Sequence, residues 1–412
     1  MAELSRRTIL KTAVAGGAAV VGAPSLAAGD PQAVIVGAGV FGTWTAIHLQ
    51  RAGWKVLLVD AWGPAHARAS SGGESRMTRA SYGADEIYSR MARDSLPEWR
   101  ALSARAELPL FHAVGVLFLF GAMDAYVRNT IEVHRRLGLA TRLFERAEIG
   151  RRFPQFDLHG VELGLFEPAF GALMARRAVQ TLVSEFVAAG GAYRQARILP
   201  PTGHAGPLER LALAGGETLS ADRFVFACGP WLAKLFPALL GRRIFPTRQE
   251  VFFLAPPAGD RSFSPAAFPG WADFNDGDIF YGFPDLEGRG VKIAHDRHGP
   301  PIDPDIVDRL PSAEALAEAR DYAARRFPAL AGARLNESRV CQYENSANGD
   351  LLIDWHPDHP DTLLVGAGSG HGFKHGPAVG ACAARLLLDR DARPEPRFAM
   401  AAKAERQDRR VH

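Results

Sequence analysis

The sequence is poor in cysteine, carries little net charge and contains no long apolar run. Three cysteines among 412 residues cannot build a disulfide framework, and no CxxC or Cys/His spacing suggests zinc. A formal net charge of +3 is too small to suggest a nucleic-acid-binding surface. No uninterrupted apolar run reaches the roughly eighteen residues of a membrane span. We therefore expect no metal, no nucleic-acid partner and no membrane-spanning segment.

Glycine and proline, by contrast, are plentiful, with 42 and 28 residues in a composition that is 47% hydrophobic and 23% charged. This composition is typical of a folded, loop-rich enzyme. At 412 residues the chain is long enough for two domains, or for one large α/β unit with an insertion.

The first residues resemble an export signal. Arg6 and Arg7 precede a mildly apolar run, residues 12–28, that is rich in glycine and alanine. A charged start, a short apolar stretch and a small-residue end are typical of secretory signals, and the arginine pair resembles the twin-arginine type. We therefore predict a signal peptide over residues 1–28, recognition by the twin-arginine translocation machinery, and a periplasmic or secreted location. A disordered basic tail is the alternative.

Residues 32–60 predict a dinucleotide-binding unit. A short apolar run, typical of a buried strand, leads into a G-x-G-x-x-G motif, and a helix and a second strand follow. In such a unit the first glycine permits a tight turn, the second lets the backbone approach a pyrophosphate, and the third lets the helix pack on the strand. An acid at the end of the second strand is placed to accept hydrogen bonds from ribose hydroxyls. The predicted cofactor-binding residues here are Gly37, Gly39, Gly42 and Asp60.

Two later segments, residues 221–236 and 361–388, also combine an apolar strand, a turn with glycine and a helix start. A glycine-rich loop that opens a late helix suits the polar end of a flavin, whose ring oxygens accept backbone N–H groups. Gly370 and Gly372 are the predicted cofactor-binding residues of this loop. An ordinary glycine-rich turn is the alternative.

Six motifs occur in order along residues 32–390: VIVGAGVFG, SSGGESRMTRASYG, RQEVFF, FYGFPDLEGRGVKIAHD, VCQYENSANGDLLIDWHP and GAGSGHGFKHG. Together they resemble the D-amino-acid-oxidase-like flavoprotein superfamily, and within it the group of monomeric sarcosine oxidase, N-methyltryptophan oxidase and pipecolate oxidase. The resemblance implies FAD as cofactor. It also implies an α/β fold, with a Rossmann-type FAD-binding domain and an inserted antiparallel-sheet α+β substrate domain.

The domain layout follows from this resemblance. Residues 393–412 mix charges with proline and alanine and are predicted to be a loosely held tail. The sequence is compatible with a monomer. The FAD-binding domain is predicted to comprise residues 31–110, 166–235 and 339–392, and the substrate domain residues 111–165 and 236–338.

One of the cysteines stands in a context that the family uses for its cofactor. In this group a cysteine followed by x-Tyr carries FAD through a thioether to the flavin 8α-methyl group, and Cys341 precedes Tyr343 in the same way. The resemblance therefore implies covalent attachment at Cys341, for which a thiolate is a suitable nucleophile. A small buried side chain is the alternative. Cys228 and Cys382 lie in apolar contexts and are predicted to be core residues.

Positively charged residues in two of the motifs are the next candidates. The resemblance implies that Arg79 pairs with the substrate carboxylate, that Lys374 is a second carboxylate clamp beside the cofactor, and that Arg76 lies near the flavin ring. Guanidinium groups suit bidentate binding of a carboxylate. Two cations around one carboxylate imply an amino-acid substrate rather than a plain amine. Solvated surface arginines are the alternative.

Lys292 lies in an alternating, strand-like stretch. The resemblance implies that it lies near flavin N5, where a fixed cation promotes the reaction with oxygen. An outward lysine on an edge strand is the alternative. Tyr281 and Tyr343 are implied to border the substrate cavity, and half-buried packing is the alternative for both.

The sequence departs from the family at three positions. Family members often carry histidines where this chain has Ser71 or Gly72, and another where Asp296 stands, four residues after Lys292. A carboxylate in place of a neutral imidazole disfavours an anionic group nearby and favours a cationic substrate arm. His295 is expected to face the other way on its strand. Sarcosine is therefore not assigned as the substrate.

Together these features predict an FAD-dependent oxidase of a secondary (N-methyl or cyclic) or primary amino acid. A hydride equivalent would pass from the carbon next to nitrogen to flavin N5, the imine would be hydrolysed, and O₂ would be reduced to H₂O₂. Two alternatives stay open. One is an exported flavin amino-acid dehydrogenase that passes electrons to a quinone or carrier, and the other is a non-catalytic flavin-binding protein.

Overall fold

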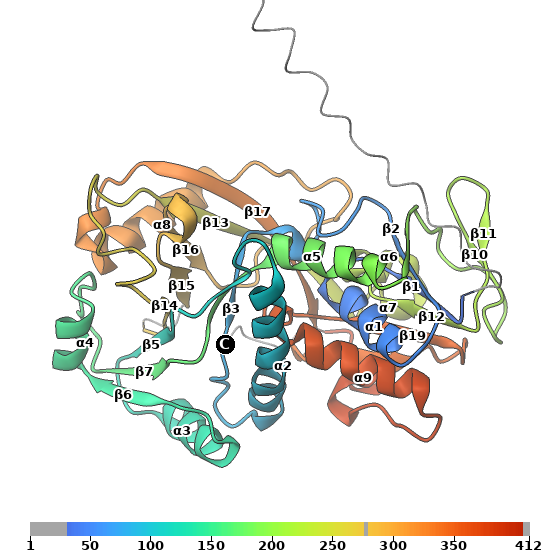
Figure 1. Cartoon of the computed structure of the whole chain (residues 1–412). Coiled ribbons are helices and arrows are strands. Elements are labelled where there is room, and N and C mark those ends of the chain that lie inside the picture. Colours follow the sequence, from blue (N-terminus) through green and yellow to red (C-terminus); the bar gives the residue numbers. More distant parts are fainter. Residues whose placement is uncertain (1–30, 276–278, 407–412) are drawn as a thin grey trace, which may run out of the picture.

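Two large sheets, one of six strands and one of eight, organise the computed structural model, which describes residues 31–275 and 279–406 (Figure 1). The six-stranded sheet is parallel except for its edge strand β18, which pairs antiparallel with β19. In spatial order it consists of β18 (Leu352–Trp355), β19 (Thr362–Gly366), β12 (Arg223–Phe226), β1 (Ala33–Val36), β2 (Val56–Asp60) and β9 (Ala192–Gln195).

The eight-stranded sheet is mainly antiparallel, with one parallel pair between β14 and β5. Its order explains why strands distant in sequence share one surface. In spatial order it consists of β17 (Leu335–Ser346), β13 (Ile244–Leu254), β16 (Val291–His295), β15 (Phe280–Phe283), β14 (Gly270–Asp273), β5 (Val116–Phe120), β7 (Leu163–Glu167) and β6 (Arg142–Glu145).

Smaller elements connect and cover these sheets. Figure 1 shows β3 and α2 between the two sheets, and α1 packed beside α9. The small sheets consist of β3 (Ser75–Thr78), β8 (Gly171–Met174) and β4 (Phe111–His112), and of β10 (Leu211–Ala212) and β11 (Thr218–Leu219). The α-helices are α1 (Val40–Arg51), α2 (Glu86–Arg105), α3 (Ala125–Leu137), α4 (Arg146–Arg152), α5 (Ala175–Ala188), α6 (Leu232–Leu235), α7 (Pro237–Leu240), α8 (Ala313–Arg326) and α9 (Gly376–Leu388).

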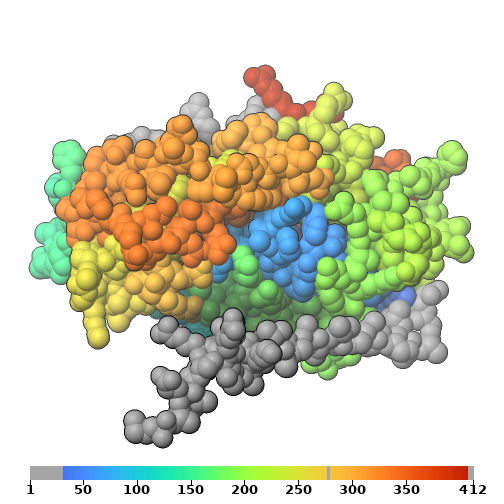
Figure 2. All heavy atoms as spheres, turned by 90° about the horizontal axis from the view of Figure 1, so that it is seen from above, coloured from blue at the N-terminus to red at the C-terminus, as the bar shows by residue number. Residues whose placement is uncertain are grey.

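The six-stranded sheet is buried on both faces, which explains the continuous apolar runs of its strands. Along β1, Ile35 points into a core that includes Trp44 of α1, whereas Val34 and Val36 point into a second core that includes Leu232. The predicted α/β fold with a Rossmann-type unit is confirmed. Figure 2 shows blue atoms from the early part of the chain between orange and green segments, so pieces that are far apart in the sequence lie side by side.

The eight-stranded sheet has one face in a core with α8 and the other face toward the site described below. Side chains alternate between the faces. Ile293, Phe280 and Trp271 pack into the core with Tyr322 of α8. The boundary predicted at residue 339 falls inside β17, because that strand pairs with β13 as far as Ser346.

The described part of the predicted tail, residues 393–406, contacts the rest of the chain. Arg397 forms ion pairs with Asp85 at 2.6 Å and Asp350 at 2.7 Å, and Phe398 is buried. The two carboxylates come from positions far away in sequence, so composition alone did not reveal this anchoring.

The predicted signal peptide, residues 1–28, lies outside the described residues, and its role stays a prediction. Among the helices of the described chain, none combines the length and the apolarity that a membrane crossing requires. All three cysteines carry free thiols.

Candidate active site

Strand register brings several predicted site residues to one face of the eight-stranded sheet. Residues opposite each other in an antiparallel pair share a face, and so do residues two apart on one strand. Tyr281 of β15 lies opposite Ala294, two residues after Lys292 on β16. Ala294 lies opposite Val251 of β13, which in turn lies opposite Arg339 of β17.

On β17, Cys341 is two residues after Arg339, and Tyr343 is two residues after Cys341. These two side chains therefore lie on the same face as Lys292 and Tyr281. His295 points to the opposite face, where it stacks on Phe280 with ring centres 4.4 Å apart. That orientation agrees with the sequence-based expectation and removes His295 from the site.

A cavity of about 360 Å³ lies at the carboxyl ends of the parallel strands. In folds of this type that edge of the sheet is the usual place for a dinucleotide. The volume of the cavity is within the range of pockets that bind extended ligands. The predicted cofactor residues Gly37, Gly39, Asp60, Gly370 and Gly372 all line it.

The glycines of the first turn have separate roles. Gly37 has φ +107°, and a Cβ there would lie 2.3 Å from Ala227 O. A Cβ on Gly42 would lie 1.9 Å from Gly37 O, so this glycine lets α1 pack against the turn. A Cβ on Gly39 would meet only Ser71 Oγ, at 3.5 Å. Gly39 therefore leaves open space for a ligand rather than relieving a clash within the protein.

Asp60 has a structural role in addition to lining the cavity. Its Oδ2 accepts a hydrogen bond from Ala38 N at 2.8 Å, and its Oδ1 accepts from Trp62 N and Gly63 N, each at 2.9 Å. The carboxylate thus joins the glycine turn after β1 to the turn after β2. A ribose hydroxyl would approach a side chain that is already fixed in place.

The thiol of Cys341 lies beside an arginine at the edge of this cavity. Arg76 Nη2 is 3.2 Å from Cys341 Sγ and also donates to Ser70 O at 2.7 Å. Both Arg76 and Ser70 line the cavity, and Cys341 is half-buried. Arg76 thus places a hydrogen-bond donor with a positive charge directly at the sulfur.

A second, smaller cavity of about 60 Å³ adjoins the first, because Arg76, Tyr343, Gly370 and Phe373 line both. Strands of the eight-stranded sheet contribute Phe118, Ala272, Tyr281 and Tyr343 to its lining. The other predicted substrate residues, Arg79, Tyr281 and Lys374, also line it. The remaining lining residues are Met77, Phe118, Ala272, Phe274, Ile279, Asp296 and His371.

The two predicted carboxylate-binding residues, Arg79 and Lys374, both make cation–π contacts with the ring of Tyr82. The guanidinium carbon of Arg79 is 4.2 Å from the centre of the Tyr82 ring, and Lys374 Nζ is 5.0 Å from it. Lys374 Nζ also donates to His371 O at 2.7 Å, and Arg79 donates to Ser81 O. Both cations are buried, which makes their interaction with an anion stronger than at the surface.

The Tyr82 hydroxyl contacts two histidines that the sequence analysis did not single out. It is 3.1 Å from His371 Nδ1 and 2.8 Å from His375 Nε2. Burial, with a smaller contribution from the charge of Lys374, holds the pKa of His375 well below its usual value. A neutral His375 behind the two cations adds no further positive charge. All three residues lie in quoted motifs, but nothing in their spacing indicated that they meet.

Lys292 is buried, with 1% of its surface exposed, so it is not an outward lysine. Its Nζ donates to Ser75 O at 3.1 Å and lies 5.1 Å from the centre of the Tyr281 ring. Burial, and then the positive charge of Arg76, lower the pKa of Lys292 to about 7. It lines a separate space of about 10 Å³ beside Glu74 and Ser75 rather than the substrate cavity.

The three departures from the family have distinct surroundings. Ser71 Oγ accepts a hydrogen bond from Val40 N at 3.1 Å. A Cβ on Gly72 would lie 2.0 Å from His66 O, so this loop has no space for a larger side chain. Asp296 lines the substrate cavity, and its Oδ1 accepts a hydrogen bond from Tyr343 Oη at 2.9 Å.

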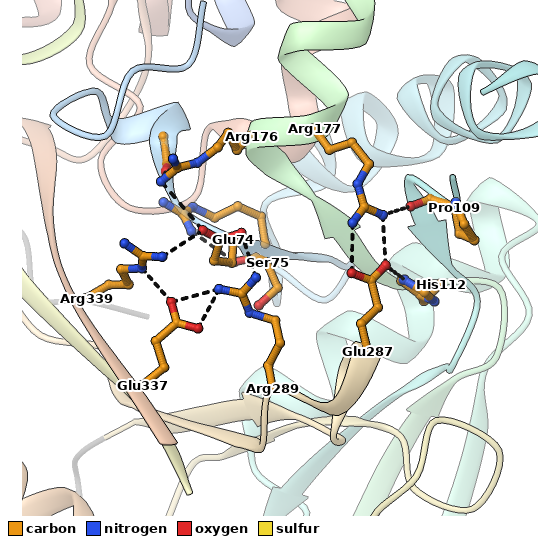
Figure 3. A network of polar contacts seen from close by, with 12 residues as sticks. Glu74, Ser75, Pro109, His112, Arg176, Arg177, Glu287, Arg289, Glu337 and Arg339 are labelled. Atoms are coloured by element: carbon orange, nitrogen blue, oxygen red, sulfur yellow. Dashed lines mark hydrogen bonds and ion pairs between the residues drawn. The ribbon is translucent and has the colours of Figure 1, made fainter. Parts of the chain in front are cut away.

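An ion-pair network joins β17 to the residues just before β3 and before β16 (Figure 3). Two of its members, Glu74 and Arg289, line the same small space as Lys292. Glu74, which precedes β3, pairs with Arg289 at 3.2 Å and Arg339 at 3.4 Å. Glu337 of β17 pairs with the same two arginines. The network fixes β3, and with it the Ser75 carbonyl that accepts from Lys292. No group of three or more potential metal ligands occurs among the described residues.

Sequence relatives cover most of the chain. It is 30% identical over 362 residues to monomeric sarcosine oxidase from Bacillus sp. strain B-0618, which is 86% of this chain and 91% of that protein. It is also 30% identical over 362 residues to N-methyl-L-tryptophan oxidase from Salmonella arizonae, covering 87% and 94% of the two chains.

Solved structures share the fold at lower identity. L-proline dehydrogenase from P. horikoshii is similar with a TM-score of 0.77 and 20% identity, over 90% of this chain and 97% of that chain. NikD, described as an unusual amino acid oxidase essential for nikkomycin biosynthesis, is similar with a TM-score of 0.71 and 21% identity, over 90% and 97%.

The sequence model described as FAD dependent oxidoreductase matches residues 32–386, nearly the whole described chain. The predicted resemblance and the predicted cofactor are thereby confirmed, and a glycine-lined cavity at the strand ends is a site that FAD fits. Covalent attachment and the roles of individual residues stay predictions. The chain belongs to the family of FAD-dependent oxidoreductases.

Proposed function

We propose that the protein is an oxidase of secondary or primary amino acids that releases H₂O₂. One observation carries this proposal: two buried cations, Arg79 and Lys374, line a small cavity that shares its walls with the cofactor cavity. A pair of cations in a water-poor cavity binds a carboxylate well. FAD, when bound, supplies the redox chemistry by accepting a hydride equivalent from the carbon next to nitrogen.

The chain's own residues bind and orient the amino acid. Arg79 and Lys374 hold the carboxylate, and the apolar side chains of Phe118 and Phe274 limit the water around it. The Tyr343 hydroxyl is held by Asp296 and fixes the side of the cavity nearest β17. Water then hydrolyses the released imine in solution, so no protein nucleophile is required.

Lys292 supports O₂ as the electron acceptor, because a buried cation stabilises the negative charge that develops on oxygen. The test is anaerobic reduction by a panel of N-methylated, cyclic and primary amino acids, followed by mixing with air. Roughly one H₂O₂ per amino acid consumed supports the oxidase. If the flavin is reduced rapidly, reoxidised slowly by O₂ and reoxidised rapidly by a quinone, the protein is a dehydrogenase and not an oxidase. If no compound reduces the flavin, the protein is a non-catalytic flavin-binding protein.

We also propose that FAD is attached through a thioether to Cys341. The proximity of Arg76, 3.2 Å from Sγ, supports this. Sγ would bond to the 8α carbon with loss of the thiol proton and one methyl proton, and O₂ would remove the electron pair left on the flavin. Acid precipitation should leave the wild-type pellet yellow, whereas Cys341→Ser should release its FAD into the supernatant. Cys382→Ser is the control, and a yellow wild-type supernatant would exclude the thioether.

We further propose export by the twin-arginine route, supported by the pattern of Arg6 and Arg7 ahead of an apolar run. Residues 1–30 fused to a reporter should direct it to the periplasm of a host with this route. Lysine at both arginine positions should retain it inside. Export of the double variant would contradict the proposal.

A further inference from the structure

The substrate cavity contains charges of both signs. Arg76, Arg79 and Lys374 contribute cations, and Asp296 is the one carboxylate among the described residues that line it. The net charge of these groups would suit any small organic anion. A carboxylate that shares the cavity with an anion-binding pair therefore needs an explanation, since it weakens the binding of a simple anion.

We infer that Asp296 recognises the positively charged nitrogen of the substrate, so that the cavity selects compact amino acids bound as zwitterions. This inference rests on the proposed function, because it concerns the same cavity. It assigns the amine, in the ammonium form that binds first, to a particular side chain. One N–H proton then passes to the Asp296 carboxylate or to water, because oxidation needs the nitrogen lone pair.

The position of Asp296 supports the inference. Asp296 follows directly on β16, and its backbone N–H donates to Ile279 O at 2.7 Å, which fixes this end of the sheet. Tyr343 Oη donates to Oδ1 at 2.9 Å, so the carboxylate has a defined orientation toward the cavity. A donated hydrogen bond and nearby cations both stabilise a carboxylate over a carboxylic acid.

The spacing of the charges suits an amino acid. Burial, and then the carboxylate of Asp296, raise the pKa of Tyr281 and of Tyr343, which line the same cavity. Asp296, Arg79 and Lys374 line one cavity of about 60 Å³, so the anion and the cations share a small space. In an α-amino acid one carbon separates the carboxylate from the nitrogen, and a cavity of about 60 Å³ suits a molecule of that compactness.

The test uses pairs of ligands that have the same shape and differ in charge. Betaine and 3,3-dimethylbutanoate form one pair, because a quaternary nitrogen replaces a quaternary carbon. Betaine is not oxidised, since its nitrogen has no lone pair. Glycine and propanoate form a smaller pair. Affinities are measured with the FAD-loaded enzyme by titration calorimetry in the absence of oxygen.

We expect the wild type to bind the cationic member of a pair at least about tenfold more tightly, which corresponds to one partly buried charge pair. Asp296→Asn keeps the shape of the side chain and should abolish the preference by weakening the cationic member alone. Asp222→Asn is the matched control, because it removes an exposed carboxylate just before β12. FAD content and melting temperature show whether each variant folds.

Equal wild-type affinities within both pairs would overturn the inference and leave the proposed function intact. A preference that survives in Asp296→Asn would also overturn it, because another group would then hold the ammonium. If none of the four ligands binds, the cavity is not an amino-acid site and the proposed function itself fails. The comparison of the two ligands within each pair uses the wild-type protein alone. Poor folding of Asp296→Asn would therefore not prevent a wild-type result from overturning the inference.

Discussion

The cofactor cavity and the substrate cavity adjoin and share Arg76 and Tyr343, but they are built from different material. The cofactor cavity is shaped by backbone: glycines at the strand ends allow chain segments to approach closely, and Asp60 joins two turns through three backbone N–H groups. The substrate cavity is shaped by side chains from the eight-stranded sheet, from β3 and the residue after it, and from the loop after β19. A backbone site tolerates few changes, whereas a side-chain site can change its charge at a single position.

The largest effect is expected at the glycine turn. Gly42→Ala places a Cβ 1.9 Å from Gly37 O, which α1 cannot avoid without moving, so we expect a loss of about 3 kcal/mol or more in stability and little FAD-containing protein. Gly39→Ala meets only Ser71 Oγ at 3.5 Å, and we expect it to fold but to bind FAD weakly. Thermal unfolding and flavin content separate the two. Equal behaviour of both variants would break the distinction between packing and ligand space.

The substrate cavity is tested next by Arg79→Met. Loss of one buried cation should lower kcat/KM by about 100-fold or more while FAD content stays at the wild-type level, because the cofactor cavity does not depend on this side chain. Arg90→Met, which removes an exposed arginine paired with Glu86, is the control. Flavin loss in Arg79→Met would mean that the two cavities are not separable.

Lys292 gives a pH-dependent test, with an expected effect smaller than that of Arg79→Met. Burial and the charge of Arg76 lower its pKa to about 7, so the ammonium is present below pH 7 and lost above it. Flavin reoxidation by O₂ should therefore slow about tenfold from pH 6 to pH 8. Stopped-flow reoxidation measures this, with anaerobic reduction as the comparison. Lys292→Met should be slow and independent of pH, and a pH profile that survives in this variant would assign the titration to another group.

The smallest effect is expected outside both cavities. Arg397→Ala removes two ion pairs, with Asp85 and Asp350, that are partly exposed, so we expect a loss of about 1 kcal/mol in stability. FAD content and kcat should not change. Arg393→Ala, whose hydrogen bonds go to the nearby carbonyls of Arg390 and Ala392, is the control and should be neutral. Urea unfolding measures both.

The same contrast explains what the sequence could predict. The cofactor half is local: a strand, three glycines at fixed spacing, a helix and an acid lie within residues 32–60, and each has a physical reason visible in the letters. The inward direction of Lys292 and the outward direction of His295 follow from strand alternation. Roles such as those of Arg79 and Lys374 came from family resemblance and not from pattern.

The remainder depends on contacts between distant segments. Tyr82 meets His371 and His375 nearly three hundred residues later in the chain, and no local period encodes that meeting. The tail around Arg397 is held by carboxylates far away in sequence. Such contacts are fixed by tertiary packing, which overrides composition.

The pairing of β13 with β17 has a consequence for how substrates are admitted. Cys341 and Tyr343 are next neighbours on one face of this long paired strand, about 7 Å apart along the extended backbone. A flavin tethered at Cys341 would have its ring held at a fixed position along β17, beside Tyr343. With the ring fixed in this way, the size of the substrate cavity, and not movement of the cofactor, would limit the side chains that an amino-acid substrate can carry.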